Sequence, residues 1–240
     1  MTKIQQEIGK IIQELPPQTH LVAVSKFHSA ESILEAYDAG QRIFGESYVK
    51  ELQQKHDVLP PDIEWHFIGH LQTNKVKYIA PYISLIHAVD TPKLLSEISK
   101  QGIKCNRKIP CLLELHVAKE ETKYGFSPQE CIDYLTSGTW KDLKGAEISG
   151  IMCMASNVDD KEQIAREFEE AYQFFQCVKD RFFHDNNSFC IRSWGMSDDF
   201  PIAIEHGSTF VRIGTRIFGQ RIYLRASFLH FFVKNVHLLP

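Results

Sequence analysis

The stretch His20-Leu21-Val22-Ala23-Val24-Ser25-Lys26 is the first of several short runs that decide the fold. It is rich in branched apolar residues, a composition typical of a strand that is buried on both faces. Ser29 then begins a helical stretch, and Gly40 suits the end of that helix. A buried strand followed at once by a helix is the repeating unit of parallel sheets.

The same strand-and-helix unit recurs along the chain. We expect further strands at residues 42–46, 65–69, 85–90, 109–117, 148–154, 188–194 and 210–214, with helical patterns between them. Ahead of the first strand, apolar residues at helical spacing predict an extra N-terminal helix that ends before Pro16 and Pro17. Eight such units in 240 residues predict an α/β protein, a single (β/α)8 TIM barrel. The same alternation also allows an open doubly wound sheet.

The division of the chain follows from the same pattern. No linker or shift in composition divides the chain before residue 222, so we expect a barrel domain over residues 1–222. Residues 223–240 are expected to form a C-terminal extension of unknown role. Its apolar stretch Phe228-Leu229-His230-Phe231-Phe232-Val233 is too short to span a membrane. A docked helix or strand, an altered reading frame and a partner-binding tail all remain open.

Composition narrows the function classes. The net charge of −3 and the absence of a long Lys/Arg run disfavour a nucleic-acid partner. The N-terminus is too polar for a signal peptide and no apolar run reaches membrane-spanning length, which predicts a cytoplasmic protein without a membrane partner. Six scattered cysteines without a C-x-x-C pair are expected to stay reduced.

Lys26 is the first candidate for chemistry, because we place it as the last residue of the first strand. In a barrel, function lies at the carboxyl ends of the strands and in the loops that follow them. A lysine there can turn its amine into the barrel mouth, where desolvation lowers its pKa and suits it to a Schiff-base linkage. The alternative is a lysine that extends its amine into solvent.

Two loops have the character of an anion site. Gly195-Met196-Ser197-Asp198-Asp199 follows the seventh strand and Ile213-Gly214-Thr215 follows the eighth, which is where barrels commonly hold a phosphate. Ser197 and Thr215 add hydroxyls, Gly214 permits close backbone approach, and Ser197 is a plausible helix N-cap. The alternative is that both loops are merely helix caps and turns.

Arg212 lies inside the apolar eighth strand, on the same face as Gly214. A buried arginine needs an acceptor. That acceptor could be a pyridine nitrogen, or Arg212 could form an ion pair with a barrel carboxylate such as Glu46 or Glu114. We find no catalytic Ser/His/Asp or Cys/His set in the sequence. His66 and His70 are an improbable metal pair, because His66 falls in a strand.

Several ordered segments give the chain a family resemblance. It resembles the pyridoxal phosphate homeostasis proteins, which are stand-alone barrels related to the N-terminal domain of alanine racemase. The matching segments together span nearly the whole chain to about residue 222. They are Leu21-Val22-Ala23-Val24-Ser25-Lys26, Phe44-Gly45-Glu46-Ser47-Tyr48-Val49, Trp65-His66-Phe67-Ile68-Gly69-His70-Leu71-Gln72-Thr73-Asn74-Lys75, Gly195-Met196-Ser197-Asp198-Asp199-Phe200 and Val211-Arg212-Ile213-Gly214-Thr215-Arg216-Ile217-Phe218-Gly219.

The resemblance implies pyridoxal 5′-phosphate as the cofactor, carried on Lys26, with Arg212 facing the pyridine nitrogen. It also implies that Ser197, Gly214 and Thr215 hold the phosphate, with Met196 in the same loop. The family usually has Asn where this chain has Ser47, so a contact near the cofactor is expected to be shortened or replaced by water.

The function implied is to hold and deliver the cofactor and to keep its free level low, without robust catalysis. The related racemases complete their site with a second domain, for which few residues remain after Gly219. Apoenzymes that need the cofactor are the implied partners, and we expect a monomer or weak homodimer. A racemase-like enzyme and a metabolite-binding barrel without the covalent bond are the alternatives.

Overall fold

Eight parallel strands close into a barrel, as the sequence predicts. The computed structural model describes residues 1–117 and 124–220. Each strand pairs with the next along the chain, and β8 returns to pair with β1 in parallel. The strands are β1 (His20–Val24), β2 (Ile43–Glu46), β3 (Glu64–Phe67), β4 (Leu85–Val89), β5 (Ile109–Leu115), β6 (Ala146–Cys153), β7 (Ile191–Ser193) and β8 (Phe210–Ile213).

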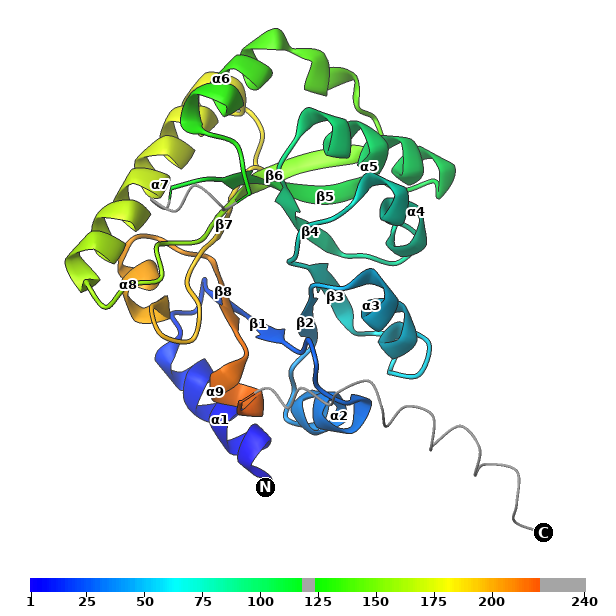
Figure 1. Ribbon diagram of the computed structural model, residues 1–240, viewed down its shortest axis with the longest axis vertical. Coiled ribbons are helices and arrows are strands. Elements are labelled where there is room, and N and C mark those ends of the chain that lie inside the picture. The colour runs from blue at the N-terminus through cyan, green and yellow to red at the C-terminus, as the bar shows by residue number, and fades with distance from the viewer. Residues whose placement is uncertain (118–123, 221–240) are drawn as a thin grey trace.

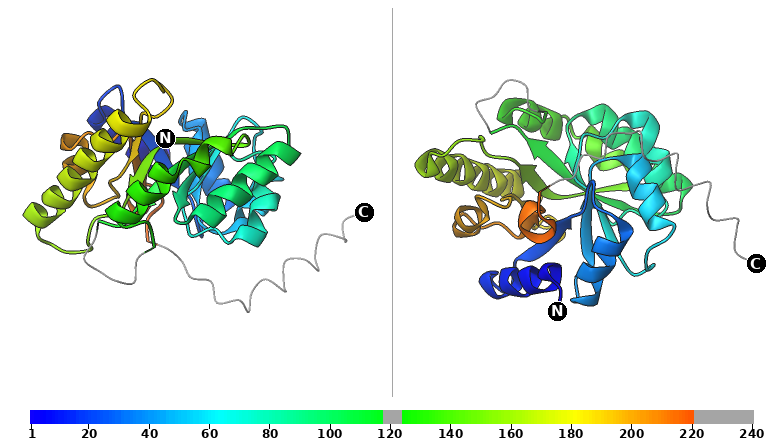
Figure 2. Two further views of the ribbon diagram at one scale, coloured as in Figure 1. Left: turned by 90° about the horizontal axis from the view of Figure 1, so that it is seen from above. Right: turned by 60° about the horizontal axis from the view of Figure 1, so that its bottom comes forward.

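Helices surround the strands on the outside of the barrel (Figures 1 and 2). Several begin at ordinary capping signals: Ser29, Thr91 and Ser127 each accept a backbone N–H in the first turn of the helix that follows. The helices are α2 (Ala30–Asp38), α3 (Val49–His56), η1 (Thr73–Lys75), α4 (Val76–Ile79), α5 (Pro92–Lys104), α6 (Pro128–Ser137), η2 (Thr139–Asp142), α7 (Lys161–Phe182), α8 (Phe200–Glu205) and α9 (Thr215–Phe218).

The predicted extra helix is α1 (Lys3–Glu14), capped by Thr2 in a capping box. In Figure 1 it lies beside α9, which is itself only one turn long. Ile8 and Ile11 on its inner face are fully buried in the core. The guanidinium of Arg216 in α9 pairs with Glu14 of α1. The N-terminal helix therefore covers the outside of the barrel where the helix after β8 is too short to do so.

Strand alternation separates an apolar outer layer from a polar interior near the mouth. On β5, Leu113 and Leu115 belong to the core under the helices, whereas Leu112 belongs to a separate small apolar cluster and Glu114 is a buried carboxylate. The same alternation on β8 buries Val211 and Ile213 in the outer core. The opposite face of these strands supplies the polar groups of the candidate site.

Three details of the prediction are wrong. β1 ends at Val24, so Lys26 lies in the turn after the strand rather than at its end. β7 has three residues rather than seven. Asp199, not Ser197, occupies the N-cap position of α8. Backbone turns that sequence patterns describe poorly replace the expected regular structure at all three places.

The remaining predictions about the chain stand as follows. None of the helices described over residues 1–117 and 124–220 is long and apolar enough to cross a membrane. All six cysteines are free thiols, as expected for reduced residues. The predicted extension at 223–240 lies outside the described residues.

Candidate functional site

A cavity of about 890 Å³ opens at the carboxyl ends of the strands. Lys26 and Ser47, two of the predicted site residues, line it, from the turns after β1 and β2. The turn after β3, the end of β5 and the segment after β6 contribute further lining residues, among them Gly69, His70, Glu114 and Met154. Its volume is in the range of cofactor and small-molecule pockets. The mouth of this barrel therefore offers both a cavity and a primary amine.

The pairing of β1 with β8 brings the Lys26 turn to the loop after β8. Ala23 is in register with Ile213, so Val24 meets Gly214 one residue further on. A Cβ on Gly214 would lie 3.1 Å from the Val24 carbonyl oxygen and 3.2 Å from its Cβ, closer than nearly all such contacts. Val24 lies two residues before Lys26 in the chain. Glycine at position 214 thus lets the loop after β8 approach the turn that carries Lys26.

The two predicted phosphate loops contact each other. The backbone N–H of Gly214 lies 3.4 Å from the hydroxyl oxygen of Ser197, to which it donates. Thr215 is exposed and begins α9, where the first backbone N–H groups of a helix have no partner within the helix. Met196 is 40% exposed, and its backbone N–H donates to the Asp199 carboxylate over 2.5 Å. The structure brings Ser197, Gly214 and Thr215 together and leaves the Met196 side chain at the surface.

Arg212 is buried beneath these loops, and its acceptors are not carboxylates. One guanidinium nitrogen donates to the carbonyl and hydroxyl oxygens of Ser193 over 2.6 and 2.7 Å, and the other donates to the Cys153 carbonyl over 3.0 Å. The ion pair to Glu46 or Glu114 is not formed, and Glu46 pairs with Lys55 instead. That alternative fails because carbonyls at the ends of β6 and β7 are nearer. Burial lowers the pKa of Arg212, although arginine remains charged in proteins.

A chain of hydrogen bonds runs from Arg212 across the barrel. The Ser193 hydroxyl lies 2.9 Å from Nδ1 of His87, and Nε2 of His87 lies 3.0 Å from Nδ1 of His66. Burial lowers the pKa of His66 to about 3 and that of His87 well below its usual range, so both rings are neutral. With Ser193 accepting from Arg212, its own proton is available to His87. Arg212 is therefore the one charged side chain in this series of hydrogen bonds.

Glu114 is a buried carboxyl group in the wall of the cavity. Its Oε2 is buried without a hydrogen-bond partner among the residues that the structure describes. Burial, and then the charge of Asp90, raise the pKa of Glu114 to about 7, against the opposing effect of Arg212. The sequence suggested this residue only as a partner for Arg212. A buried orphan oxygen beside the cavity is the kind of group that a bound molecule can satisfy.

Lys55 is the buried group that the sequence missed. It extends from α3 toward the ends of β1 and β2, and its ammonium group lies 2.7 Å from Oε1 of both Glu46 and Glu51. The only local signal is the i, i+4 spacing of Glu51 and Lys55 on a helix. That spacing alone describes an ordinary surface ion pair. Its partners from the turn after β1 and from β2, Ser25 and Glu46, are distant in sequence.

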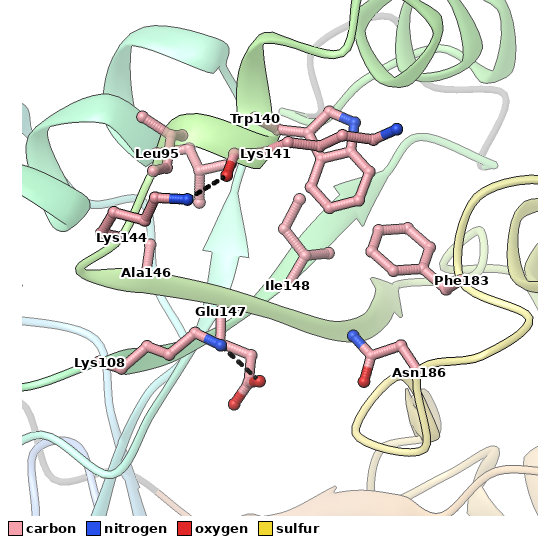
Figure 3. Close-up of a pocket in the computed structure, with 11 residues that line it drawn as sticks. Leu95, Lys108, Trp140, Lys141, Lys144, Ala146, Glu147, Ile148, Phe183 and Asn186 are labelled. Carbon is pink, nitrogen blue, oxygen red and sulfur yellow. Dashed lines mark hydrogen bonds and ion pairs between the residues drawn. The ribbon is translucent and has the colours of Figure 1, made fainter.

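A second cavity lies at the opposite end of the barrel, where the chain enters β5, β6 and β7 (Figure 3). It is about 330 Å³ in volume. Its lysines are engaged: Lys108 lies 2.9 Å from the Glu147 carboxylate and Lys144 donates to the Lys141 carbonyl over 3.3 Å (Figure 3). None of the predicted site residues lines it. In this fold the amino-terminal end of the strands serves stability rather than function.

No group of residues suited to a metal ion occurs in the described part of the chain. The two histidines considered for a metal face different surroundings. His66 is buried inside the barrel, whereas His70 is partly exposed at the cavity, 2.8 Å from the Asp90 carboxylate and stacked on Tyr124. The bend that Gly69 allows between them separates their side chains.

Known proteins match this chain over most of its length. The sequence model of the alanine racemase N-terminal domain matches residues 1–222. A pyridoxal phosphate homeostasis protein of Aquifex aeolicus is 37% identical over 207 residues, 85% of this chain and 87% of that protein. The structure of PipY from Synechococcus elongatus without pyridoxal phosphate is 31% identical with a TM-score of 0.84, covering 90% of this chain and 100% of PipY.

PipY has also been solved with pyridoxal phosphate bound, and that structure matches with 30% identity and a TM-score of 0.81 over the same shares of the two chains. These similarities extend over the strands and loops that form the barrel mouth. The chain therefore belongs to the pyridoxal phosphate homeostasis protein family and shares its barrel with the N-terminal domain of alanine racemase.

Proposed function

We propose that this protein binds pyridoxal 5′-phosphate through a covalent Schiff-base linkage to Lys26, and that it holds and delivers this cofactor without robust catalysis. The observation that carries the proposal is the place of Lys26, which lines the mouth cavity in a turn adjoining Gly214. The names of the relatives and the bound form of PipY support the choice of cofactor and a role in its homeostasis.

The phosphate end of the cofactor fits the loops after β7 and β8. The Ser197 hydroxyl and the Gly214 N–H already meet there, and Thr215 adds a hydroxyl at the start of α9. The absence of a side chain at Gly214 leaves the backbone open to close approach. We assign the phosphate to Ser197, Gly214 and Thr215, with the Met196 backbone in the same loop.

We place the ring of the cofactor between Lys26 and Arg212. When bound, pyridoxal phosphate supplies an aldehyde for an amine and an aromatic ring that withdraws electrons from atoms attached to it. Lys26 would supply the amine that joins the aldehyde carbon through a carbon–nitrogen double bond, with the aldehyde oxygen leaving as water. We place Ser47 beside this bond, because it lines the same cavity.

Arg212 is the reason we favour holding over turnover. Its guanidinium keeps its proton, so a pyridine nitrogen beside it accepts a hydrogen bond and is not protonated. An unprotonated ring is a weaker electron sink than one paired with a carboxylic acid. The buried chain from Ser193 to His66 adds no charge that would change this. A racemase-like enzyme is the second candidate, favoured only by Glu114, a carboxyl with a raised pKa in the cavity wall.

The binding step is tested by absorption spectroscopy. Purified protein titrated with pyridoxal 5′-phosphate is expected to develop a visible absorption band that Lys26→Ala lacks. Ser197→Ala is expected to keep the band and to weaken binding by about 1–3 kcal/mol, because a charge-assisted hydrogen bond to phosphate is lost. The proposal fails if wild type gives no band, or if Lys26→Ala gives the same one.

Delivery and turnover are tested separately. The loaded protein, mixed with an apoenzyme that requires pyridoxal phosphate, is expected to restore that enzyme's activity while losing its own band. Assayed with a panel of amino acids, the loaded protein is expected to show no substantial racemisation. Substantial turnover that is abolished by Glu114→Gln would replace the carrier role with the enzyme role.

Further parts of the proposal concern the oligomeric state, the cellular compartment and the partners of the protein. We propose that the barrel of residues 1–222 binds the cofactor as a monomer or weak homodimer in the cytoplasm, with apoenzymes as its macromolecular partners. Light scattering across a range of protein concentrations tests the oligomeric state. A stable dimer at low micromolar concentration would contradict that part.

A further inference from the structure

Lys55 has all three of its ammonium protons engaged around the turn that carries Lys26. It donates to the carbonyl oxygen of Ser25 over 2.8 Å and to the carboxylates of Glu46 and Glu51 over 2.7 Å each. Its side chain is 8% exposed and that of Glu46 is fully buried. A lysine has three N–H donors, so this one is saturated by partners from three elements.

The two carboxylates extend the network to both neighbours of Lys26. The Ser25 hydroxyl donates to Oε1 of Glu46 over 2.6 Å, and the backbone N–H of Phe27 donates to Oε1 of Glu51 over 2.6 Å. Residues 25 and 27 are therefore each tied to the Lys55 group. Lys26 therefore lies between two residues, Ser25 and Phe27, that hydrogen bonds restrain.

The conformation of this turn requires such fixing. Phe27 has φ 67°, in the left-handed region, which costs a residue other than glycine about 1–2 kcal/mol. Phe27 as a whole is 38% exposed, and its ring lies 5.2 Å from the ring of Tyr48. The bond from the Phe27 N–H to Glu51 stabilises this conformation directly, and Lys55 holds Glu51 in place.

Lys55 and Glu51 do not line the cavity that Lys26 lines. They line a separate cavity of about 670 Å³, which lies on the side of the turn occupied by Phe27, His28 and Phe218. A molecule in the mouth cavity would meet the amine of Lys26 but not this network. Lys55 does not contact such a molecule itself, and its bonds to the Ser25 carbonyl and, through Glu51, to the Phe27 N–H act on the backbone that carries Lys26.

We propose that Lys55, with Glu46 and Glu51, is a positioning residue that fixes the Lys26 turn so that the Lys26 amine is presented to the aldehyde of the cofactor. This inference rests on the proposed function, since it takes Lys26 as the point of covalent attachment. Without Lys55, two carboxylates close to one another lose their shared cation, and the turn loses the bond to the Ser25 carbonyl. The turn then relaxes from the left-handed conformation at Phe27, and the amine loses its orientation.

The test separates covalent attachment from binding as such. Pyridoxine 5′-phosphate carries an alcohol in place of the aldehyde and cannot form a carbon–nitrogen double bond with an amine. Its dissociation constant therefore measures non-covalent binding alone. In Lys55→Met, the dissociation constant for pyridoxal 5′-phosphate is expected to rise about tenfold or more, because misplacing a reacting group has effects of this size. The constant for pyridoxine 5′-phosphate is expected to change by less than about threefold.

Two further variants keep the test decisive if Lys55→Met does not fold. Glu51→Gln retains an oxygen that accepts from the Phe27 N–H and is expected to bind pyridoxal 5′-phosphate nearly as wild type does. Glu51→Ala removes that oxygen and is expected to reproduce the selective loss. Arg107→Met is the matched control: Arg107 donates to the carbonyls of Ala80 and Ile83 over 2.7 Å each, near the other end of the barrel. It should lower the melting temperature without changing either dissociation constant.

The outcomes distinguish the two proposals. Equal loss of affinity for both compounds in Lys55→Met and Glu51→Ala, or no loss for either, overturns the positioning role while leaving Lys26 as the attachment point. A wild-type protein that binds the aldehyde and the alcohol equally well, without dependence on Lys26, overturns the proposed function itself. Selective loss for the aldehyde alone supports both.

Discussion

At the scale of single residues, the sequence indicates a buried polar side chain when its sequence neighbours are apolar. It does not indicate one that is buried by partners distant in sequence. Arg212 was recognisable because an arginine stands in an apolar run. His87 stands in a similar run, but its partners Ser193 and His66 come from β7 and β3. Lys55 looks like an ordinary helix lysine until β1 and β2 bury it. Burial depends on tertiary packing, which local patterns do not contain.

Glu114 gives a prediction about pH at this scale. Its pKa is raised to about 7 when folded, by burial first and then by Asp90, against 4.5 as its ordinary value. Between these values the folded state binds a proton that the unfolded state lacks, so this carboxyl makes the fold less stable as pH rises from about 4.5 to 7. Glu114→Gln removes that dependence.

The measurement is urea unfolding of both proteins at pH 5 and pH 8. Relative to wild type, Glu114→Gln is expected to gain stability at pH 8, by up to about 3 kcal/mol, since one pKa unit corresponds to roughly 1.4 kcal/mol. Glu130→Gln is a suitable comparison, because this exposed carboxyl has its pKa lowered by the Ser127 cap and should lose stability instead. A stability difference between Glu114→Gln and wild type that does not change with pH would show that Glu114 is not buried as described.

At the scale of elements, the seam between β7 and β8 combines a short ladder and the backbone bonds Thr209 N–H to Arg192 O and Arg212 N–H to Gly195 O with bonds from side chains. Only Ser193 and Phe210 are paired in the ladder between these strands. Arg212 of β8 donates to the Ser193 carbonyl, and the Ser208 hydroxyl donates to the Trp194 carbonyl over 2.7 Å. The sequence predicted a seven-residue β7, and the structure has three residues. Most of the difference lies before the strand, where Ser188 belongs to a turn and bonds back to the Asn186 side chain, which apolar content does not reveal.

Arg212→Met is the corresponding prediction. It leaves the Ser193 and Cys153 carbonyls without their donor and is expected to destabilise the barrel by about 2–4 kcal/mol. Hydrogen exchange should quicken in β7 and β8 more than in β3 or β4. Affinity for pyridoxal 5′-phosphate should also fall.

Arg192→Met is the matched comparison for that variant. Arg192 lies on β7, the strand beside that of Arg212, and donates to the Gly207 and Cys190 carbonyls, toward the amino-terminal end. It is expected to lower stability but to leave cofactor affinity unchanged. Equal affinity losses in both variants would mean that Arg212 acts on the cofactor only through the fold.

At the scale of the whole molecule, periodicity was enough to predict the eight strands and the extra N-terminal helix. The division at residue 222 stays a prediction, because residues 221–240 lie outside the described part of the chain. The sequence could not show why α1 is needed. The structure shows it beside a single-turn α9, held by Arg216 and Glu14, on the outside of the barrel near β8 and β1.

A ligand held at the mouth joins loops that follow strands from opposite ends of the sequence, so binding should stabilise the whole barrel. At one hundred times its dissociation constant, pyridoxal 5′-phosphate is expected to raise the melting temperature by about 5–10 °C. Lys26→Ala should show a smaller rise at the same concentration. An equal rise in both proteins would indicate binding that does not involve Lys26.

The covalent attachment can be located directly by reduction. Borohydride treatment of the loaded protein converts a carbon–nitrogen double bond into a stable amine, and peptide mass spectrometry then identifies the modified lysine. We predict that the phosphopyridoxyl group is found on the peptide containing Lys26 and disappears in Lys26→Ala. A label on another lysine, or none on a protein that has bound the cofactor, would contradict the assignment of Lys26.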